Sequence, residues 1–439
     1  MKMTREERNW VLYDVGNSAF VLLVSTIMPL YFNHLAGSAG LLDSDYLAYW
    51  GYAASIATII VAVMGPVVGT MADMKGFKKI LFTISMLVGA AGCISLGFAK
   101  QWLVFLGIFI IAKSGFASSL IFYDAMLTDV TDDERMDEVS SQGYAWGYIG
   151  SCIPFIACLA LVLGSDKIGL SMESAMAVSF AIVAVWWIVM TLPLLKTYRQ
   201  RHYVERKPHA VKDSFTRIGR TLVNARKEKK IFLFLIAFFF YIDGVYTIID
   251  MATAYGSALG LDSTGLLLAL LVTQLIAFPS AIIFGKLAKR FNTEKLILVC
   301  ISAYLFIAIF AIFLATQLQF WILAVLVGMF QGGVQALSRS YFAKIIPAEQ
   351  AGEYFGLMDI CGKGAAFLGT TVVGVVTQIT GSMSKGVGMI SVFFVIGIVF
   401  FNMAMKVDNT GKVHAKKKTH NEEPVEDMGG SYKYPIDIV

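Results

Sequence analysis

Charged side chains inside long apolar segments are the residues of this sequence best placed to do chemistry. They are Asp14, Lys113, Asp124, Asp243, Asp250, Arg339, Asp359 and Lys363. An ionisable side chain inside a membrane segment is costly unless it is paired or faces a polar cavity. Such groups can bind a charged solute, carry a proton or hold two helices together. We therefore treat them as candidate binding, coupling and gating residues.

Helical spacing groups these charges with polar neighbours, because residues three, four, seven and eleven apart return to nearly one face. Lys113 and Asp124 nearly share a face, and Asp243, Tyr246 and Asp250 form one stripe. Other polar faces hold Asp14 with Asn17, Gln331 with Gln335, and the pair Asp359 and Lys363.

Depth along each segment separates two groups. Lys113 and Asp243 fall near mid-membrane, where transporters bind solutes. We expect the substrate site to contain Lys113, Asp243, Tyr246, Gln331, Gln335, Tyr144 and Asn17. Asp250 lies toward the outer side, and the other charges lie in the cytoplasmic third. We expect coupling or gating roles for Asp14, Asp124, Asp250, Arg339, Asp359 and Lys363.

Structural interpretations compete with these roles. Asp14 could be a helix N-cap, and Asp124 with Arg339 a structural bridge. Lys113 and Asp243 could form a static pair, and so could Asp359 and Lys363. Tyr241, Tyr246, Tyr144 and Trp146 could stack on a cationic substrate or serve in packing. The acidic loop 132–138 reads as solvent-exposed.

Twelve apolar segments, each long enough to span a bilayer, position these residues. They cover 15–35, 46–71, 80–99, 102–127, 141–163, 172–195, 231–255, 264–287, 296–316, 320–346, 354–379 and 386–405. With 57% hydrophobic and 15% charged residues, the chain is an all-α polytopic membrane protein. The runs are long and continuous, which excludes a β-barrel.

Six segments lie on each side of a basic linker. We expect an N-terminal bundle over 1–195, a cytoplasmic linker over 196–230, a C-terminal bundle over 231–405 and a disordered tail over 406–439. Lys and Arg concentrate at both ends and in the even-numbered connections, which places both termini in the cytoplasm. The expected location is the cell inner (plasma) membrane, without a cleavable signal. This topology accounts for the net charge of +5, and we expect no nucleic-acid partner.

The cysteines show neither a disulfide framework nor a metal-binding pattern, so we expect no cofactor. Glycine-rich stretches read as packing within one chain, which favours a monomer. The five histidines fall at membrane edges or in cytoplasmic segments, and no nucleophile–base constellation lies inside the spans, so a lipid-modifying membrane enzyme is disfavoured.

The two halves share a plan, and one motif carries a family resemblance. The run Gly65, Gly69, Asp73, Gly76 and Lys78–Lys79 resembles the loop motif of the major facilitator superfamily. The resemblance implies two six-helix bundles and a conformational lock formed by Gly65, Gly69, Asp73 and Lys78. It also implies that the first, fourth, seventh and tenth helices line a central cavity. The counterpart after Gly285 lacks the Asp.

Three further motifs resemble one branch of that superfamily, named for a yeast vacuolar, autophagy-related amino-acid effluxer. They are Tyr13-Asp14 with Asn17-Ser18-Ala19-Phe20, Tyr123-Asp124 with Trp146-Gly147-Tyr148, and Gln331 to Tyr341 with Glu353 to Gly356. The sequence departs from the branch at Val15-Gly16 and Asp124.

The sequence thus predicts a secondary active transporter for a small polar or zwitterionic, amino-acid-like solute. Alternating access and coupling to protons are expected, because a buried carboxyl such as Asp243 can exchange a proton during transport. Lipid or drug efflux is the alternative transport function. A non-transporting sensor or scaffold is the alternative of another class.

Overall fold

The computed structural model of the chain describes residues 2–205 and 228–407 and is almost entirely helical. The N-terminal half begins with one long helix that contains a π-helical turn, and five further long helices follow. Its elements are α1 (Arg5–Leu22), η1 (Leu23–Ile27), α2 (Met28–Ser38), α3 (Asp43–Ala72), α4 (Phe77–Leu96), α5 (Trp102–Ala125), α6 (Leu127–Val130), α7 (Met136–Leu163), η2 (Ser165–Ile168) and α8 (Met172–Thr197).

The C-terminal half repeats this plan with six membrane-length helices. Its elements are α10 (Lys229–Ala258), α11 (Ser263–Leu287), α12 (Thr293–Ile312), α13 (Gln317–Ile345), η3 (Ala348–Gln350), α14 (Ala351–Thr380), α15 (Met383–Gly388) and α16 (Ile390–Met405). Over the described ranges, the one strand-like contact is a bridge between Met74 and Val204.

Eleven helical spans among the described residues are long and apolar enough to cross a membrane. The twelfth helix, α14, has 30 residues and an apolar outer part over Leu368–Thr380. The fold is therefore the predicted twelve-helix arrangement. The first helix starts at Arg5, earlier than predicted, because Thr4 and Glu7 form a capping box that extends it past the apolar run.

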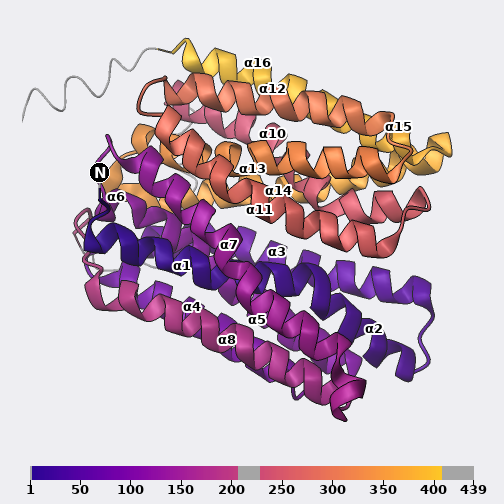
Figure 1. Cartoon of the computed structure of the whole chain (residues 1–439). Coiled ribbons are helices and arrows are strands. Elements are labelled where there is room, and N and C mark those ends of the chain that lie inside the picture. Colours follow the sequence, from indigo (N-terminus) through magenta and orange to yellow (C-terminus); the bar gives the residue numbers. More distant parts are fainter. Residues whose placement is uncertain (1, 206–227, 408–439) are drawn as a thin grey trace, which may run out of the picture.

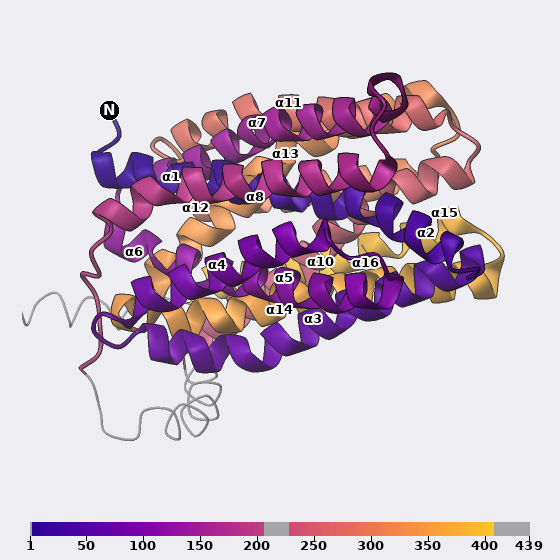
Figure 2. The ribbon, with the colours of Figure 1, turned by 90° about the horizontal axis from the view of Figure 1, so that it is seen from below.

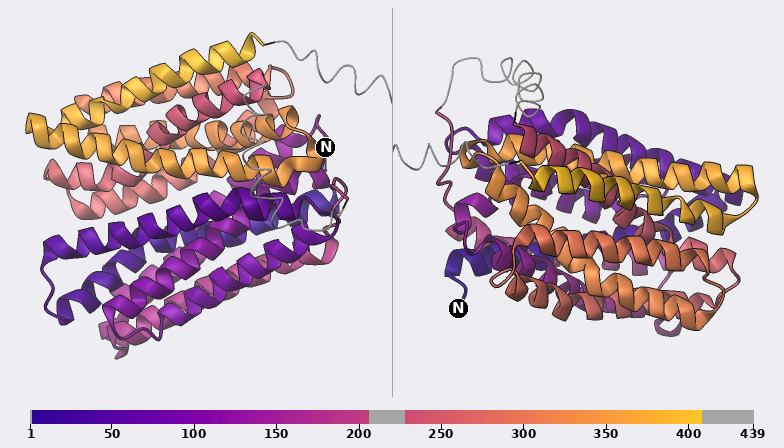
Figure 3. Two further views of the ribbon diagram at one scale, coloured as in Figure 1. Left: turned by 180° about the vertical axis from the view of Figure 1, so that it is seen from behind. Right: turned by 90° about the horizontal axis from the view of Figure 1, so that it is seen from above.

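The two halves lie side by side as two bundles (Figure 1). Both described chain ends, near Thr4 and Val407, lie at one end of the molecule, which we call the terminal end; the opposite end, with α2 and α15, is the distal end (Figures 1 and 2). The bundles are close together at the terminal end and diverge toward the distal end (Figures 1 and 3).

Side-chain burial follows the rule for a bilayer rather than for water. Large apolar side chains point outward, as at Ile59 (61% exposed), Leu103 (65%) and Phe313 (70%). Hydrocarbon accepts such surfaces, and the helices satisfy the backbone polar groups internally. Polar and charged groups are collected inside, between the helices and between the halves.

Two predicted segments lie partly or wholly outside the described residues. Residues 206–227 of the predicted linker and the tail beyond 407 are not described. The five cysteines are free.

Candidate functional site

The central charges of the two halves face each other, but not in the predicted pairing. Lys113 on α5 attracts Asp250 on α10 electrostatically, and its ammonium lies 5.7 Å from the centre of the Phe109 ring. Asp250 is exposed and Lys113 is half-buried. The static Lys113–Asp243 pair that the sequence left open as an alternative is not formed, because Asp243 is turned toward α14 instead.

Asp243 is completely buried between α10 and α14. Its Oδ1 accepts hydrogen bonds from the Gly369 amide (3.0 Å) and the Thr247 hydroxyl (3.2 Å). Its Oδ2 is also buried and has no hydrogen-bond partner among the described residues. No cation contacts this carboxyl within the described part of the chain.

The predicted polar and aromatic residues do not form one site: some contact the other half, and others pack within their own half. Tyr246 is half-buried near Asp124 and Asp359. Gln335 accepts a hydrogen bond from Tyr148 of the other half (2.9 Å), and Gln331 is buried one turn away on α13. The remaining predicted aromatic residues are Tyr144, which lies beside Arg339, Tyr241, which is packed inside the C-terminal half, and Trp146, whose ring lies beside Phe278.

Arg339 on α13 reaches across to the N-terminal half and binds three of its helices. Its Nη2 lies 3.2 Å from Asp14 on α1, and its Nη1 lies 3.1 Å from Asp124 on α5. Its Nε donates to the hydroxyl of Ser140 on α7 (2.9 Å), and its Nη2 donates to the backbone carbonyl of the same residue (3.0 Å). The planar fork of arginine suits such a multidentate contact.

Aromatic rings enclose the same guanidinium. The centres of the Trp10 and Tyr144 rings lie 4.6 and 4.3 Å from Arg339 Cζ, which is within cation–π range. Gly143 makes the approach possible, since a Cβ there would lie 2.4 Å from Asp14 Oδ2 and 2.9 Å from Arg339 Nη2. Tyr144 therefore contacts a protein cation in this conformation.

Asp14 is not the helix N-cap that the sequence allowed, because Thr4 caps α1 and Asp14 lies inside the helix. Its carboxylate accepts from the Tyr123 hydroxyl (2.8 Å) and from the Asn17 amide (3.3 Å) as well as from Arg339. Asn17 thus supports Asp14 and is buried. Asp124 remains 29% exposed, so it is the more accessible acid of this cluster.

Asp73 joins the halves at the terminal end. The carboxylate accepts hydrogen bonds from the amides of Gly352 (2.7 Å) and Glu353 (2.9 Å) in the first turn of α14, where the helix has free amides and a positive dipole end. The backbones touch here, because a Cβ on Gly69 would lie 2.3 Å from the Gly352 carbonyl oxygen. A Cβ on Gly356 would likewise lie 2.9 Å from the carbonyl oxygen of Gly65.

Burial raises the pKa of the Asp73 carboxyl to about 7. The positive charge of Lys78 and the two α14 amides offset only part of the loss of hydration, and the nearby Glu353 opposes them. A group with this pKa changes charge near physiological pH.

Lys78 makes its ion pair within the N-terminal half rather than across the halves. Its ammonium lies 2.9 Å from Asp129, and both side chains are completely buried. Asp129 also accepts from the Tyr198 hydroxyl (2.5 Å) and from the amides of Arg201 and His202 (3.0 and 2.8 Å). The start of the linker is thereby held against the loop that carries Asp73.

Asp137 provides a third contact between the halves at the terminal end. It accepts from the hydroxyls of Ser340 (2.6 Å) and Thr293 (2.7 Å) and pairs with Lys344 (2.5 Å). Its neighbour Glu138 pairs with Lys289 (2.7 Å). The expectation that the whole loop 132–138 is solvent-exposed is wrong for these two residues, because the C-terminal half covers them.

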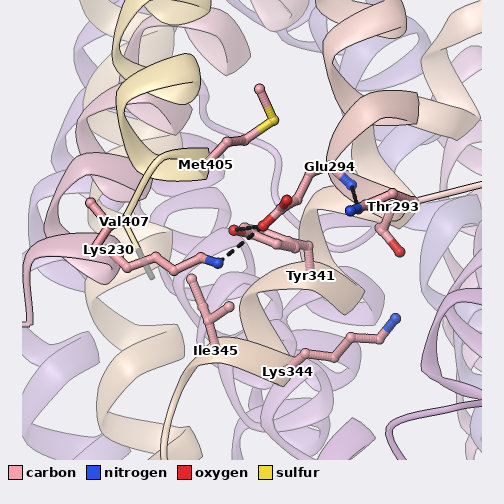
Figure 4. A pocket seen from close by; sticks show the side chains of 9 residues that line it. Lys230, Thr293, Glu294, Tyr341, Lys344, Ile345, Met405 and Val407 are labelled. Atoms are coloured by element: carbon pink, nitrogen blue, oxygen red, sulfur yellow. Dashed lines mark hydrogen bonds and ion pairs between the residues drawn. The ribbon is translucent and has the colours of Figure 1, made fainter. Parts of the chain in front are cut away.

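A polar cleft of about 440 Å³ lies beside this contact, at the ends of four helices of the C-terminal half (Figure 4). In it, Glu294 binds the Lys230 ammonium (3.1 Å) and the Tyr341 hydroxyl (2.8 Å). The cleft is lined by Lys230, Asn292, Thr293, Glu294, Tyr341, Lys344, Ile345, Met405 and Val407. It is distinct from the charges Lys113 and Asp250, which do not line it.

The sequence reasoning missed Asp129, Asp137 and Ser140. Acidic and hydroxyl residues at helix ends usually face water, so nothing in their own positions predicted burial. The one available signal was that acidic residues after one helix and basic residues in the connections of the other half carry opposite charges. For the predicted pair Asp359 and Lys363, the Lys363 side chain lies outside the described residues. Within the described part of the chain, no group of His, Cys, Asp and Glu could hold a metal ion.

Comparisons with known proteins agree on family and fold. Residues 3–416 match the family model described as "Vacuole effluxer Atg22 like". The chain is 44% identical over 403 residues to the uncharacterised MFS-type transporter YxiO of Bacillus subtilis (strain 168), covering 91% of this chain and 94% of YxiO. It is 24% identical over 319 residues to autophagy-related protein 22 of Coccidioides immitis (strain RS), covering 66% of this chain and 52% of that protein. The structure resembles the major facilitator superfamily transporter FucP in its outward conformation, with a TM-score of 0.67, 14% identity, and coverage of 91% of this chain and 98% of FucP.

Proposed function

The chain belongs to the Atg22-like branch of the major facilitator superfamily, and on this premise we propose that it carries a small zwitterionic, amino-acid-like solute across the membrane by proton-coupled alternating access. As a member of this family it is a multi-pass membrane transporter and not an enzyme. The proposal places the protein in the bacterial inner membrane with the terminal end in the cytoplasm.

The opposed charges Lys113 and Asp250 support the class of solute. They come from different halves and attract each other, and neither side chain is fully buried. A zwitterion can replace this attraction by placing its carboxylate on Lys113 and its ammonium on Asp250. Tyr246, on the same stripe of α10, is a candidate for contacts with the solute body.

The buried Asp243 supports a proton as the coupling ion. An ionised carboxylate that is buried without a cation is very costly, whereas the neutral acid is not. Asp243 therefore carries a proton in this conformation. Release of that proton requires a conformation in which water or a cation reaches Asp243, which ties protonation to the transport cycle.

The contacts at the terminal end form the proposed gate. Asp73 and Arg339 each join the halves there, and Asp137 adds a third junction. Alternating access requires that these contacts break together while the distal ends approach each other. Two further charges, Asp359 and Lys363, remain candidate gating residues at this end of α14.

The test is solute counterflow in proteoliposomes that contain the purified protein. Labelled amino acids, glycine betaine and dipeptides are compared, with and without an imposed pH gradient. The proposal expects saturable exchange of zwitterions that Lys113→Ala and Asp250→Asn each weaken at least tenfold in affinity. Exchange of apolar drugs or lipids instead, with zwitterions inactive, would contradict the proposed solute class.

A further inference from the structure

Asp243 holds α14 at a point where a helix normally has no free amide. Its Oδ1 accepts from the amide of Gly369, deep inside α14, at 3.0 Å. An interior amide ordinarily donates to the carbonyl four residues earlier. A side chain that competes for such an amide loosens the helix locally and marks a place where it can bend.

The sequence around this contact fits the close approach. A Cβ on Gly369 would lie 2.1 Å from Thr247 Oγ1 and 2.4 Å from Asp243 Oδ1, so a glycine is required there. Thr247, one turn after Asp243 on α10, donates its hydroxyl to the same carboxyl oxygen (3.2 Å). Thr247 and Gly369 therefore act as positioning residues for Asp243.

The same helix is also held at its first turn, by the other half of the protein. Asp73 binds the amides of Gly352 and Glu353. Gly352 and Gly369 are separated by about 25 Å of helix at 1.5 Å per residue. One helix thus connects the buried carboxyl of α10 with the contact that closes the terminal end.

We propose that α14 transmits the protonation state of Asp243 to the closure at the terminal end. While Asp243 is neutral, α14 stays against α10 and its first turn remains on Asp73. When Asp243 loses its proton, the carboxylate needs water, so α14 separates from α10 near Gly369 and its first turn leaves Asp73. This inference rests on the proposed proton coupling and adds the route by which the proton acts.

The experiment measures opening of the terminal end as a function of pH. Spin labels are placed at Lys79→Cys and Arg290→Cys, two exposed positions on opposite halves, after replacement of the native cysteines. Distances are measured by electron–electron resonance in nanodiscs between pH 5 and pH 9. Because Asp73 itself has a pKa near 7, its titration is removed by Asp73→Asn in every sample.

The inference expects the Asp73→Asn protein to open increasingly as the pH rises. Adding Asp243→Asn should abolish the pH dependence, whereas adding Asp250→Asn, a matched loss of a carboxylate from α10, should retain it. Adding Thr247→Val should shift the midpoint upward by about one pH unit, since a hydrogen bond to the charged form is lost. Thr247→Ser should restore the midpoint.

Two results would overturn the inference. One is pH-dependent opening that persists with Asp243→Asn, and the other is opening that is already independent of pH with Asp73→Asn alone. Solute-driven proton uptake, measured separately on the unmodified protein, distinguishes the causes of failure. Proton uptake without Asp243-dependent opening refutes only the role of α14, whereas absence of proton uptake refutes the proposed coupling.

Discussion

Replacement of Asp73 by alanine should weaken the closure of the terminal end. Two amides in the first turn of α14 lose a completely buried acceptor. Loss of a helix cap costs about 1 kcal/mol, and loss of a hydrogen bond to a charged group costs roughly 1.5–3 kcal/mol. In the open state water replaces part of these hydrogen bonds, so we expect the free energy that favours the closed state to fall by about 2 kcal/mol. This corresponds to about a 30-fold change in the ratio of closed to open protein.

The assay is the rate of maleimide reaction at Ser141→Cys, in a background without the native cysteines. Ser141 is buried against Gly285 of the other half, so its reaction requires opening. Asp73→Ala should raise the rate about 30-fold. Asp73→Asn, which keeps one acceptor oxygen, should raise it less. A change of under threefold for Asp73→Ala would refute the assignment of this contact as a closure.

The same group gives closure a dependence on pH. In the closed state the pKa of Asp73 is about 7, and in an exposed state it returns toward its ordinary value of 3.8. A raised pKa means that the closed state binds the proton more tightly. The contribution of Asp73 to closure is therefore fully present below about pH 4 and is lost as the pH rises through 7. Asp73→Ala should remove this part of the pH dependence of Ser141→Cys reactivity.

Three further predictions concern packing and buried charge. Gly69→Ala should raise the rate of maleimide reaction at Ser141→Cys about tenfold, since its Cβ would overlap the Gly352 carbonyl. The control Gly51→Ala should change that rate little, because nothing lies within 4 Å of a Cβ there. Lys78→Met should reduce the free energy of unfolding by about 3–5 kcal/mol, measured by thermal denaturation, because Asp129 is left buried without its cation. Arg339→Lys should increase opening about tenfold in the spin-label measurement, since lysine has a single ammonium in place of the guanidinium fork.

Each of these has a contradicting outcome. Equal effects of Gly69→Ala and Gly51→Ala would show that backbone contact between α3 and α14 does not limit opening. If adding Asp129→Leu to Lys78→Met recovered no stability, the buried charge would not be the cause of the loss. If the Arg339→Lys protein closed to the same extent as the unmodified protein, the contacts of Arg339 would serve packing and not closure.

The positions of the helices could be predicted from the sequence because a long apolar segment in a bilayer has almost no stable structure other than a helix. Twelve long apolar runs with a basic linker define two bundles, and the buried charges mark the inside of the bundles. The Asp124–Arg339 contact was foreseen as one interpretation, and it is present. The Asp73 contact with α14 lies where the family resemblance placed a lock.

The pairings across the halves were harder to predict, for physical reasons. Lys113 attracts Asp250 rather than pairing with Asp243, because the relative rotation and depth of two bundles are not encoded in the phase of either helix. Asp129 lies in the short helix α6 and Asp137 in the first turn of α7, where acidic residues usually face water, and both are buried by segments far away in the chain. The orientation of Asp243 depends on the local contact with Gly369, which helical periodicity does not reveal.

The most direct test of the account is solute-driven proton movement in proteoliposomes, with the pH reported by an enclosed dye. The account predicts that a zwitterionic amino acid taken by the unmodified protein moves protons, and that Asp243→Asn exchanges the same solute without moving protons. Proton movement that persists in Asp243→Asn would contradict the central claim that this buried carboxyl carries the coupling proton.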